Sequence, residues 1–165
     1  MSMMQKILCL FSLIIATNVQ ATPCSEKQYS EFDFWLGKWE VSNNTNTNIS
    51  HNKITKINNG CGLLEEYTTP TGYQGKSLNI YNKQDKHWHQ TWVDNSGLLL
   101  QLKGRLINNE MVMKGVTYDK ENNKVENKIT WQPLENGKVR QHWQQKDNKT
   151  NEWQTVFDGL YTSAS

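Results

Sequence analysis

Short alternating segments separated by turn residues are the feature that most constrains the fold of this chain. Turn signals such as Asn59-Gly60, Asn95-Ser96-Gly97 and Glu135-Asn136-Gly137 recur between them. Short strands at regular spacing, separated by such turn residues, are typical of an all-β sandwich or barrel. We predict about ten short strands. They cover residues 38–43, 49–58, 61–69, 75–82, 87–94, 98–107, 111–118, 125–133, 139–145 and 153–161.

The connections between these segments are short, and no later stretch has a helical run long enough for α/β units. Sequential hairpins without a long crossover favour an up-and-down antiparallel β-barrel, which leaves no exposed sheet edge. Before the first strand, residues 25–36 carry a cap-like start and apolar residues on one helical face. We expect this short N-terminal helix to close one barrel end and to turn at Gly37 into the first strand.

The first 21 residues have the pattern of a signal peptide. Lys6 supplies the positive start, residues 7–16 form an apolar run, and Val19-Gln20-Ala21 fits a cleavage site. The apolar run is too short to span a bilayer, so we expect no stable membrane anchor. The sequence thus predicts cleavage near Ala21, a periplasmic or secreted location, and a single domain over residues 22–165.

Charge and cysteine content narrow the possible partners. The net charge is +2 without a basic cluster, so nucleic acid is not an expected partner. Cys9 leaves with the signal peptide, and the remaining Cys24 and Cys61 predict a disulfide in an exported chain. Two free thiols or half a metal site are the alternatives. No C-x-x-C motif or His-rich pair supports a metal site, and we expect neither metal nor cofactor.

Alternation within the strands separates an inner from an outer face. In the strand 87–94, Trp88, Gln90, Trp92 and Asp94 share one face, and His87 and His89 share the other. The Trp-bearing face is the better candidate for the interior because Trp gains most from burial. The same phase places His142 and Arg140 outside. The predicted lining is Trp88, Gln90, Trp92, Asp94, Trp131, Gln141 and Trp143.

Amides and a carboxylate among inward indoles need hydrogen-bond partners. A filled core in which these groups bond one another is one solution, and a cavity for a polar ligand is another. We favour the cavity because barrels near this strand number can enclose a ligand.

Adjacent Glu65 and Glu66 lie on opposite faces of one strand, so one of them must point inward. With Asp94, the inward residue could form a carboxylate pair for acid–base chemistry. The alternative is a salt bridge or a turn cap, and Asp94 also fits a turn residue. No nucleophile elbow, phosphate-binding loop or Ser/His/Asp arrangement is present in the sequence.

Several motifs resemble an uncharacterised family of exported bacterial proteins that is regarded as lipocalin-like. They are FDFWLGKWEV, GCGLLEE, GKSLNIYN, WHQTWVD, KITWQP, VRQHW and FDGLY, and they cover residues 24–161. Gly37-Lys38-Trp39 also resembles the G-x-W opening of the calycin group. That resemblance implies a barrel for small, mostly hydrophobic ligands, with a late Arg over the Trp. Arg140 is the nearest candidate for this Arg.

Three functions follow as hypotheses. The first is an exported, non-catalytic barrel that binds a small molecule, whose identity the sequence does not give. The second is an enzyme that uses Glu65 or Glu66 together with Asp94. The third is a haem-binding barrel, because about ten strands also resemble nitrobindin-like proteins, although the phase places His87, His89 and His142 outside.

Overall fold

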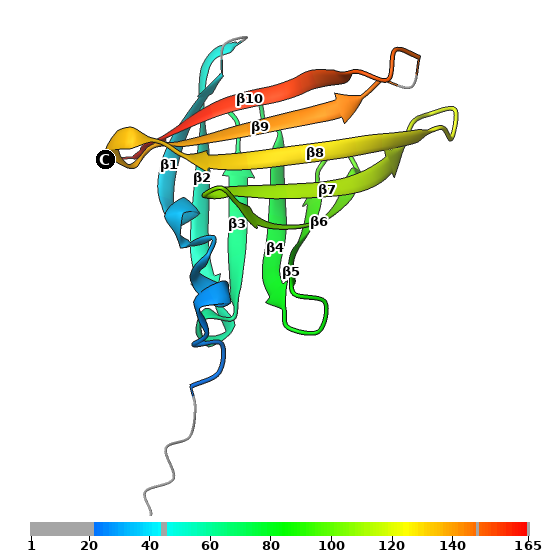
Figure 1. Ribbon diagram of the computed structural model, residues 1–165. Helices are drawn as coiled ribbons and strands as arrows, with labels where there is room; N and C mark the ends of the chain where they lie inside the picture. The colour runs from blue at the N-terminus through cyan, green and yellow to red at the C-terminus, as the bar shows by residue number, and fades with distance from the viewer. Residues whose placement is uncertain (1–21, 44–45, 148, 165) are drawn as a thin grey trace, which may run out of the picture.

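The protein is a closed barrel of ten antiparallel strands (Figure 1). The computed structural model describes residues 22–43, 46–147 and 149–164, so the predicted signal peptide lies outside the described residues. Each strand pairs with its sequence neighbours, and β1 pairs with β10 to close the sheet, with Trp39 opposite Ser163. The predicted up-and-down barrel is confirmed.

The observed strands follow the predicted segments closely, and most bounds shift by only a residue or two. They are β1 (Gly37–Asn43), β2 (Asn46–Ile57), β3 (Gly62–Thr68), β4 (Gln74–Asn82), β5 (His87–Asp94), β6 (Leu99–Ile107), β7 (Glu110–Tyr118), β8 (Lys124–Pro133), β9 (Val139–Lys146) and β10 (Trp153–Ser163).

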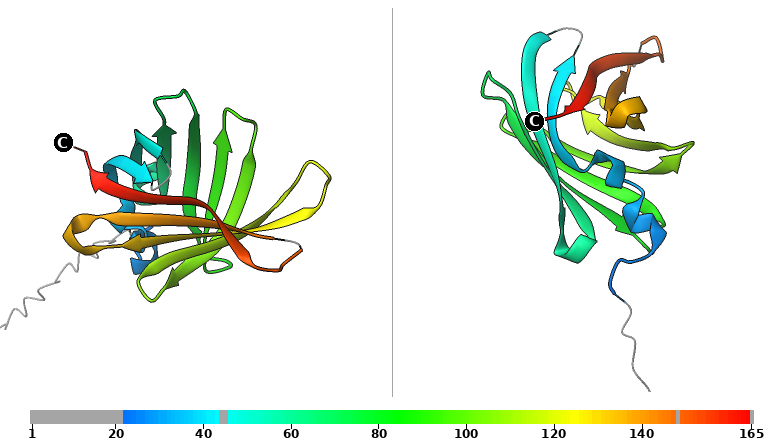
Figure 2. Two further views of the ribbon diagram at one scale, coloured as in Figure 1. Left: turned by 90° about the horizontal axis from the view of Figure 1, so that it is seen from above. Right: turned by 90° about the vertical axis from the view of Figure 1, so that its left-hand side faces the viewer.

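The N-terminal helix consists of two short 3-10 turns, η1 (Lys27–Ser30) and η2 (Asp33–Trp35). Two further 3-10 turns, η3 (Asn58–Gly60) and η4 (Glu135–Gly137), form hairpin connections. After η2 the chain turns into β1 at Gly37, whose φ of 139° is readily available only to glycine. Figure 2 shows this N-terminal segment in blue at one end of the barrel. We call this the closed end, and the opposite end the open end.

Aromatic packing fixes the N-terminal segment in the closed end. The Phe32 ring stacks on Trp35 at 4.8 Å between centroids and meets Trp131 and Trp88 edge-on at 5.2 and 5.7 Å. All four side chains are fully buried. Aromatic side chains bury large areas, and their rings pack in preferred stacked or edge-on arrangements. This cluster therefore makes the N-terminal segment part of the barrel core.

The predicted disulfide between Cys24 and Cys61 is present. It joins the residues before η1 to the β2–β3 hairpin, so it fixes the start of the N-terminal segment to the closed end. The covalent bond and the aromatic cluster therefore restrain the same short segment from its two ends.

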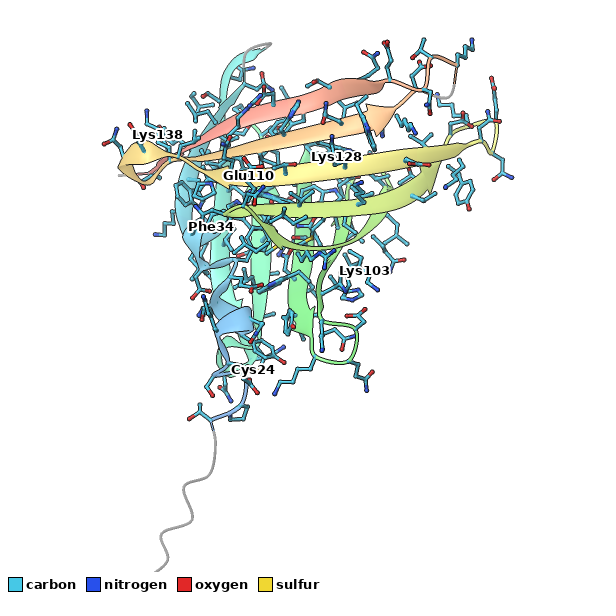
Figure 3. All side chains as sticks on the ribbon, in the orientation of Figure 1. Cys24, Phe34, Lys103, Glu110, Lys128 and Lys138 are labelled. Atoms are coloured by element: carbon cyan, nitrogen blue, oxygen red, sulfur yellow. A yellow bond between two sulfur atoms is a disulfide. The ribbon has the colours of Figure 1, made fainter. Side chains whose placement is uncertain are left out.

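Lys103 and Lys128 are among the charged side chains on the outer face (Figure 3). Arg140 is also on this face and forms a two-point ion pair with Asp158, at 2.7 and 2.6 Å. The calycin-like Arg over Trp39 is therefore not formed by Arg140. The Trp39 indole N–H instead donates to the Trp35 carbonyl at 2.9 Å. None of the helices in the described part of the chain is long and apolar enough to cross a membrane.

The disulfide closes a loop with a sequence separation of 37 residues. We expect the double variant Cys24→Ser/Cys61→Ser to lose about 3–4 kcal/mol of unfolding free energy, because the unfolded chain regains loop entropy. Urea unfolding measures this change. Reduced wild-type protein is the control and should match the variant. Equal stability of oxidised and reduced protein would contradict the assignment.

Candidate functional site

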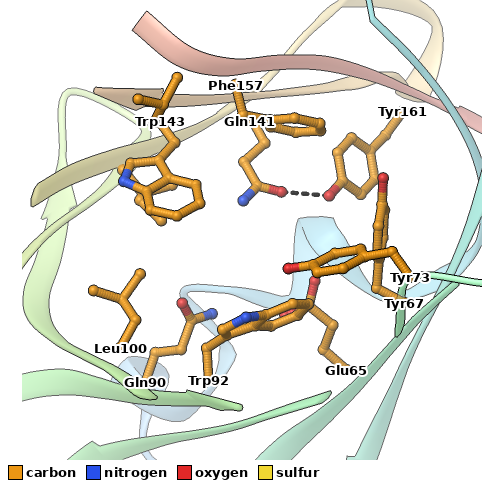
Figure 4. A pocket seen from close by; sticks show the side chains of 12 residues that line it. Glu65, Tyr67, Tyr73, Gln90, Trp92, Leu100, Gln141, Trp143, Phe157 and Tyr161 are labelled. Atoms are coloured by element: carbon orange, nitrogen blue, oxygen red, sulfur yellow. Dashed lines mark hydrogen bonds between the residues drawn. The ribbon is translucent and has the colours of Figure 1, made fainter. Parts of the chain in front are cut away.

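The barrel contains an internal cavity of about 180 Å³ in its middle and open-end sections (Figure 4). Its twelve lining residues combine aromatic, aliphatic and amide side chains with one carboxylate. They are Glu65, Tyr67, Tyr73, Gln90, Trp92, Leu100, Ile129, Gln141, Trp143, Val156, Phe157 and Tyr161.

Polarity changes along the barrel axis. The closed end is filled by the aromatic cluster around Phe32, and the middle layer is polar. The open-end layer is aromatic again, with Tyr73, Trp92 and Trp143 only partly buried. Glu65 in the middle layer is 3% exposed, while Val156 toward the open end is 48% exposed. The cavity therefore reaches solvent at the open end and ends at buried polar groups.

Glu65 is the centre of the polar layer. Its carboxylate accepts a hydrogen bond from Asn52 Nδ2 at 2.7 Å and one from Ser77 Oγ at 2.6 Å. Asn52 Nδ2 also donates to the Tyr161 hydroxyl at 3.3 Å, and that hydroxyl donates to the Gln141 side-chain carbonyl. These residues come from β2, β3, β4, β9 and β10, so closure of the barrel assembles the layer.

A second set of amides fixes the direction of the Ser77 hydroxyl. Asn79 Nδ2 donates to Ser77 Oγ at 2.9 Å, and Gln90 Nε2 donates to it at 3.4 Å and to Asn79 Oδ1 at 2.8 Å. With both of its acceptor positions used, the Ser77 hydroxyl hydrogen is directed to Glu65. The layer is thus arranged to donate hydrogen bonds to a carboxylate.

Burial dominates the electrostatics of this layer. Loss of solvation raises the pKa of Glu65 from 4.5 to about 7, even though the hydrogen bonds from Ser77 and Asn52 act in the opposite direction. Burial also raises the pKa of Tyr161 and Tyr67, and the nearby Glu65 charge raises both further. Glu65 is consequently the group of this layer that titrates near neutral pH.

One wall of the open end is formed by Trp92 and Tyr73, which both donate to Asp94 Oδ2, at 3.1 and 2.7 Å. The Trp92 ring lies directly over Gly75 on the neighbouring strand. A Cβ at position 75 would come within 2.2 Å of the ring, so only glycine permits this arrangement. Asp94 therefore fixes the edge of the indole while Gly75 provides room for its face.

The opposite wall depends on an irregularity in β10. The β9–β10 register shifts between Thr155 and Phe157, so Val156 is an extra residue in a bulge. Bulges redirect side chains, and here both Val156 and Phe157 line the cavity. Beside them, Trp143 Nε1 donates to Asn127 Oδ1 at 2.9 Å, which holds this indole in place.

The structure brings together four of the seven residues that the sequence predicts as lining: Gln90, Trp92, Gln141 and Trp143. Asp94 lies at the open-end rim, where it binds the Trp92 and Tyr73 side chains rather than lining the cavity. Trp88 and Trp131 have the predicted inward phase but lie at the closed end, where they pack on Phe32.

The predicted carboxylate candidates are also separated. Glu65 points inward, whereas Glu66 lies on the outer face and pairs with Lys76 at 2.9 Å. Burial raises the pKa of Asp94, but hydrogen bonds from Ser96, Tyr73 and Trp92 outweigh this effect and lower the pKa to about 2. Asp94 is therefore ionised at neutral pH and occupied as a rim hydrogen-bond acceptor. Glu65 remains as the carboxyl that lines the cavity.

Sequence reasoning did not include Tyr67, Tyr161 and Phe157 among the site residues. Tyr67 follows Glu65 by two positions on the same strand face, so alternation could have found it once Glu65 was placed inside. Tyr161 could have been found likewise, since it lies on the core face of β10. Phe157 precedes Tyr161 by four positions on the same face, so alternation could have found it as well. Val156 could not have been found in this way, because it is the extra residue of the bulge.

The strand histidines lie on the outer face, as their phase predicts. His89 Nε2 is 2.7 Å from Asp85 Oδ2, and His142 Nε2 is 2.9 Å from Thr155 Oγ1. Among residues 22–43, 46–147 and 149–164, no group of three or more His, Cys, Asp or Glu side chains could hold a metal ion.

The site is therefore a small internal cavity of a closed β-barrel, with a buried carboxylate at its polar end. Comparison with protein-family models gave no match, and comparison with curated proteins gave none either.

The raised pKa of Glu65 predicts a pH-dependent stability. A carboxyl whose pKa is higher in the folded than in the unfolded state stabilises the fold below the unfolded value. That contribution is lost as pH rises through the folded value. Relative to Glu65→Gln, wild-type protein should lose about 3 kcal/mol of unfolding free energy between about pH 4.5 and pH 7 or slightly above.

Urea unfolding at several pH values measures this difference, and the subtraction removes titrations that both proteins share. Glu66→Gln is the matched control on the outer face of the same strand, and it should keep the wild-type pH dependence. Parallel stability curves for wild type and Glu65→Gln would show that Glu65 has no raised pKa.

Proposed function

We propose that this protein is an exported, lipocalin-like barrel that binds a small molecule in its internal cavity and does not catalyse a reaction. The observation that carries the proposal is a cavity of about 180 Å³ with aromatic walls and buried polar groups at its inner end. Mostly apolar cavities with a few placed polar groups are typical small-molecule sites.

The cavity volume indicates the size of the ligand. An internal cavity of about 150 Å³ is large enough to hold a benzene molecule. A volume of about 180 Å³ therefore suits a single ring with one small polar substituent. The ring would lie between Trp92 and Trp143, and the substituent would reach the layer around Glu65.

Export is supported by two independent features. The sequence of residues 1–21 has the pattern of a signal peptide, and the Cys24–Cys61 disulfide is typical of proteins from oxidising compartments. Together they favour a periplasmic or extracellular protein that meets its ligand outside the cytoplasm.

The lining favours binding over the other two hypotheses. Acid–base catalysis commonly needs a second placed group, and Glu65 is the one carboxylate among the twelve lining residues. A haem site needs a much larger space than the single ring for which a cavity of about 180 Å³ has room. A non-catalytic binding site requires only the groups that line the cavity.

Indole N–H signals in NMR spectra provide a direct test with benzyl alcohol, a neutral single-ring probe. We expect the Trp92 and Trp143 signals to shift on titration, because both indoles line the cavity, while those of Trp88 and Trp131 stay unchanged. Val156→Trp should abolish the shifts by filling the open end.

The matched control is Val93→Trp on the outer face of β5. Val93 and Val156 are about equally exposed, at 50% and 48%, so both variants add the same bulk to a comparably exposed position. The proposal fails if neither benzyl alcohol nor its charged analogue benzylamine moves the Trp92 and Trp143 signals, or if both variants affect these signals equally.

A further inference from the structure

Glu65 is a buried carboxylate without a cationic partner. It is 3% exposed, and none of the twelve residues that line its cavity is Lys, Arg or His. Among the described residues, no ion pair involves Glu65, although Glu66 next to it is paired with Lys76. A buried ionised group is costly unless an opposite charge accompanies it.

The hydrogen bonds around Glu65 nevertheless suit the ionised form. Asn52 donates to one oxygen and Ser77 to the other, and the Asn79 and Gln90 amides fix the Ser77 hydroxyl in that direction. A carboxylate oxygen can accept two hydrogen bonds. Each oxygen of Glu65 therefore retains one acceptor position beyond its bond from Asn52 or Ser77.

The walls of the cavity complement a cation as well. Tyr67 and Trp92 have ring centroids 6.3 Å apart, and Trp143 and Phe157 line the other side. Aromatic faces attract ammonium groups through the ring quadrupole, most strongly where water is excluded. The same faces also accept a ligand ring by stacking.

We propose that the ligand is a small organic cation, a protonated amine on a single ring, whose ammonium group donates hydrogen bonds to Glu65. This inference rests on the proposed function and names the class of ligand. Charge selects this class, because an anion would be repelled by the carboxylate. A neutral ligand would leave the Glu65 carboxylate without a counter-charge.

Binding should then depend on pH through Glu65. The ionisable groups that face Glu65 are Tyr67 on the same strand and Tyr161 on β10, and burial raises the pKa of both phenols, so they stay neutral. The pKa of Glu65 is about 7, so its charge is lost as the pH falls below that value. Amine binding should weaken in the same range.

Three probes with one ring and different charge test the inference by calorimetry: benzylamine, benzyl alcohol and benzoate. At about pH 8 we expect benzylamine to bind at least about tenfold more tightly than benzyl alcohol, and benzoate to bind most weakly. At about pH 5.5 the affinity for benzylamine should fall by about tenfold or more, because Glu65 is then protonated.

Glu65→Gln removes the charge and keeps the size of the side chain. It should lower the benzylamine affinity by about tenfold or more and abolish the pH dependence of benzylamine binding. A circular dichroism spectrum that matches wild type shows that the variant is folded. Glu66→Gln is the control and should behave as wild type. If Glu65→Gln does not fold, the wild-type probe series and pH series still decide the matter.

The outcomes separate this inference from the proposed function. If benzyl alcohol binds as tightly as benzylamine, or if Glu65→Gln leaves the preference unchanged, the cation class is wrong and the binding barrel stands. If none of the three probes binds at either pH, both proposals are wrong.

Discussion

Closure of the sheet between β1 and β10 is the constraint on which the rest of this structure depends. Once the barrel is closed, alternate side chains along its strands point inward, whether they are apolar or not. Polar side chains in these positions must then find partners inside the barrel. The layer around Glu65 meets this requirement with side chains from five strands, and no smaller unit of the fold contains all of them.

The two ends of the barrel differ in how their aromatic side chains are used. At the closed end, four fully buried aromatic rings and a disulfide fix the N-terminal segment, so this end is a packed core. At the open end, Trp92 and Trp143 are held at their edges by Asp94 and Asn127, so their faces remain available to the cavity. Tryptophan packs in the core at the closed end and lines the cavity at the open end. Residue type alone therefore does not distinguish a core position from a cavity position.

Strand β4 shows why the polar layer was hard to predict. Its inward residues include Ser77 and Asn79, whereas Leu78 and Ile80 point outward and are 58% and 47% exposed. If burial of apolar side chains alone set the orientation, Leu78 and Ile80 would point inward. The observed orientation of β4 instead places Ser77 opposite Glu65 of β3, and Asn79 opposite Gln90 of β5. A shift by one residue would remove the partners of Glu65 from the interior.

The sequence by itself determined the strands, the turns, the disulfide and the inward phase of the tryptophan-bearing strands. These features depend on local alternation, turn chemistry and a single cysteine pair. Only the tertiary structure decided which inward residues meet. Trp88 and Trp92 share one strand face, yet one packs against Phe32 and the other lines the cavity, because their heights along the barrel differ. The position of Val156 on the cavity wall likewise depended on a bulge that pairing between β9 and β10 creates. The position of a residue along the barrel axis and the register of its strand are both set by pairing with neighbouring strands. The residue pattern along a single strand does not specify either of them.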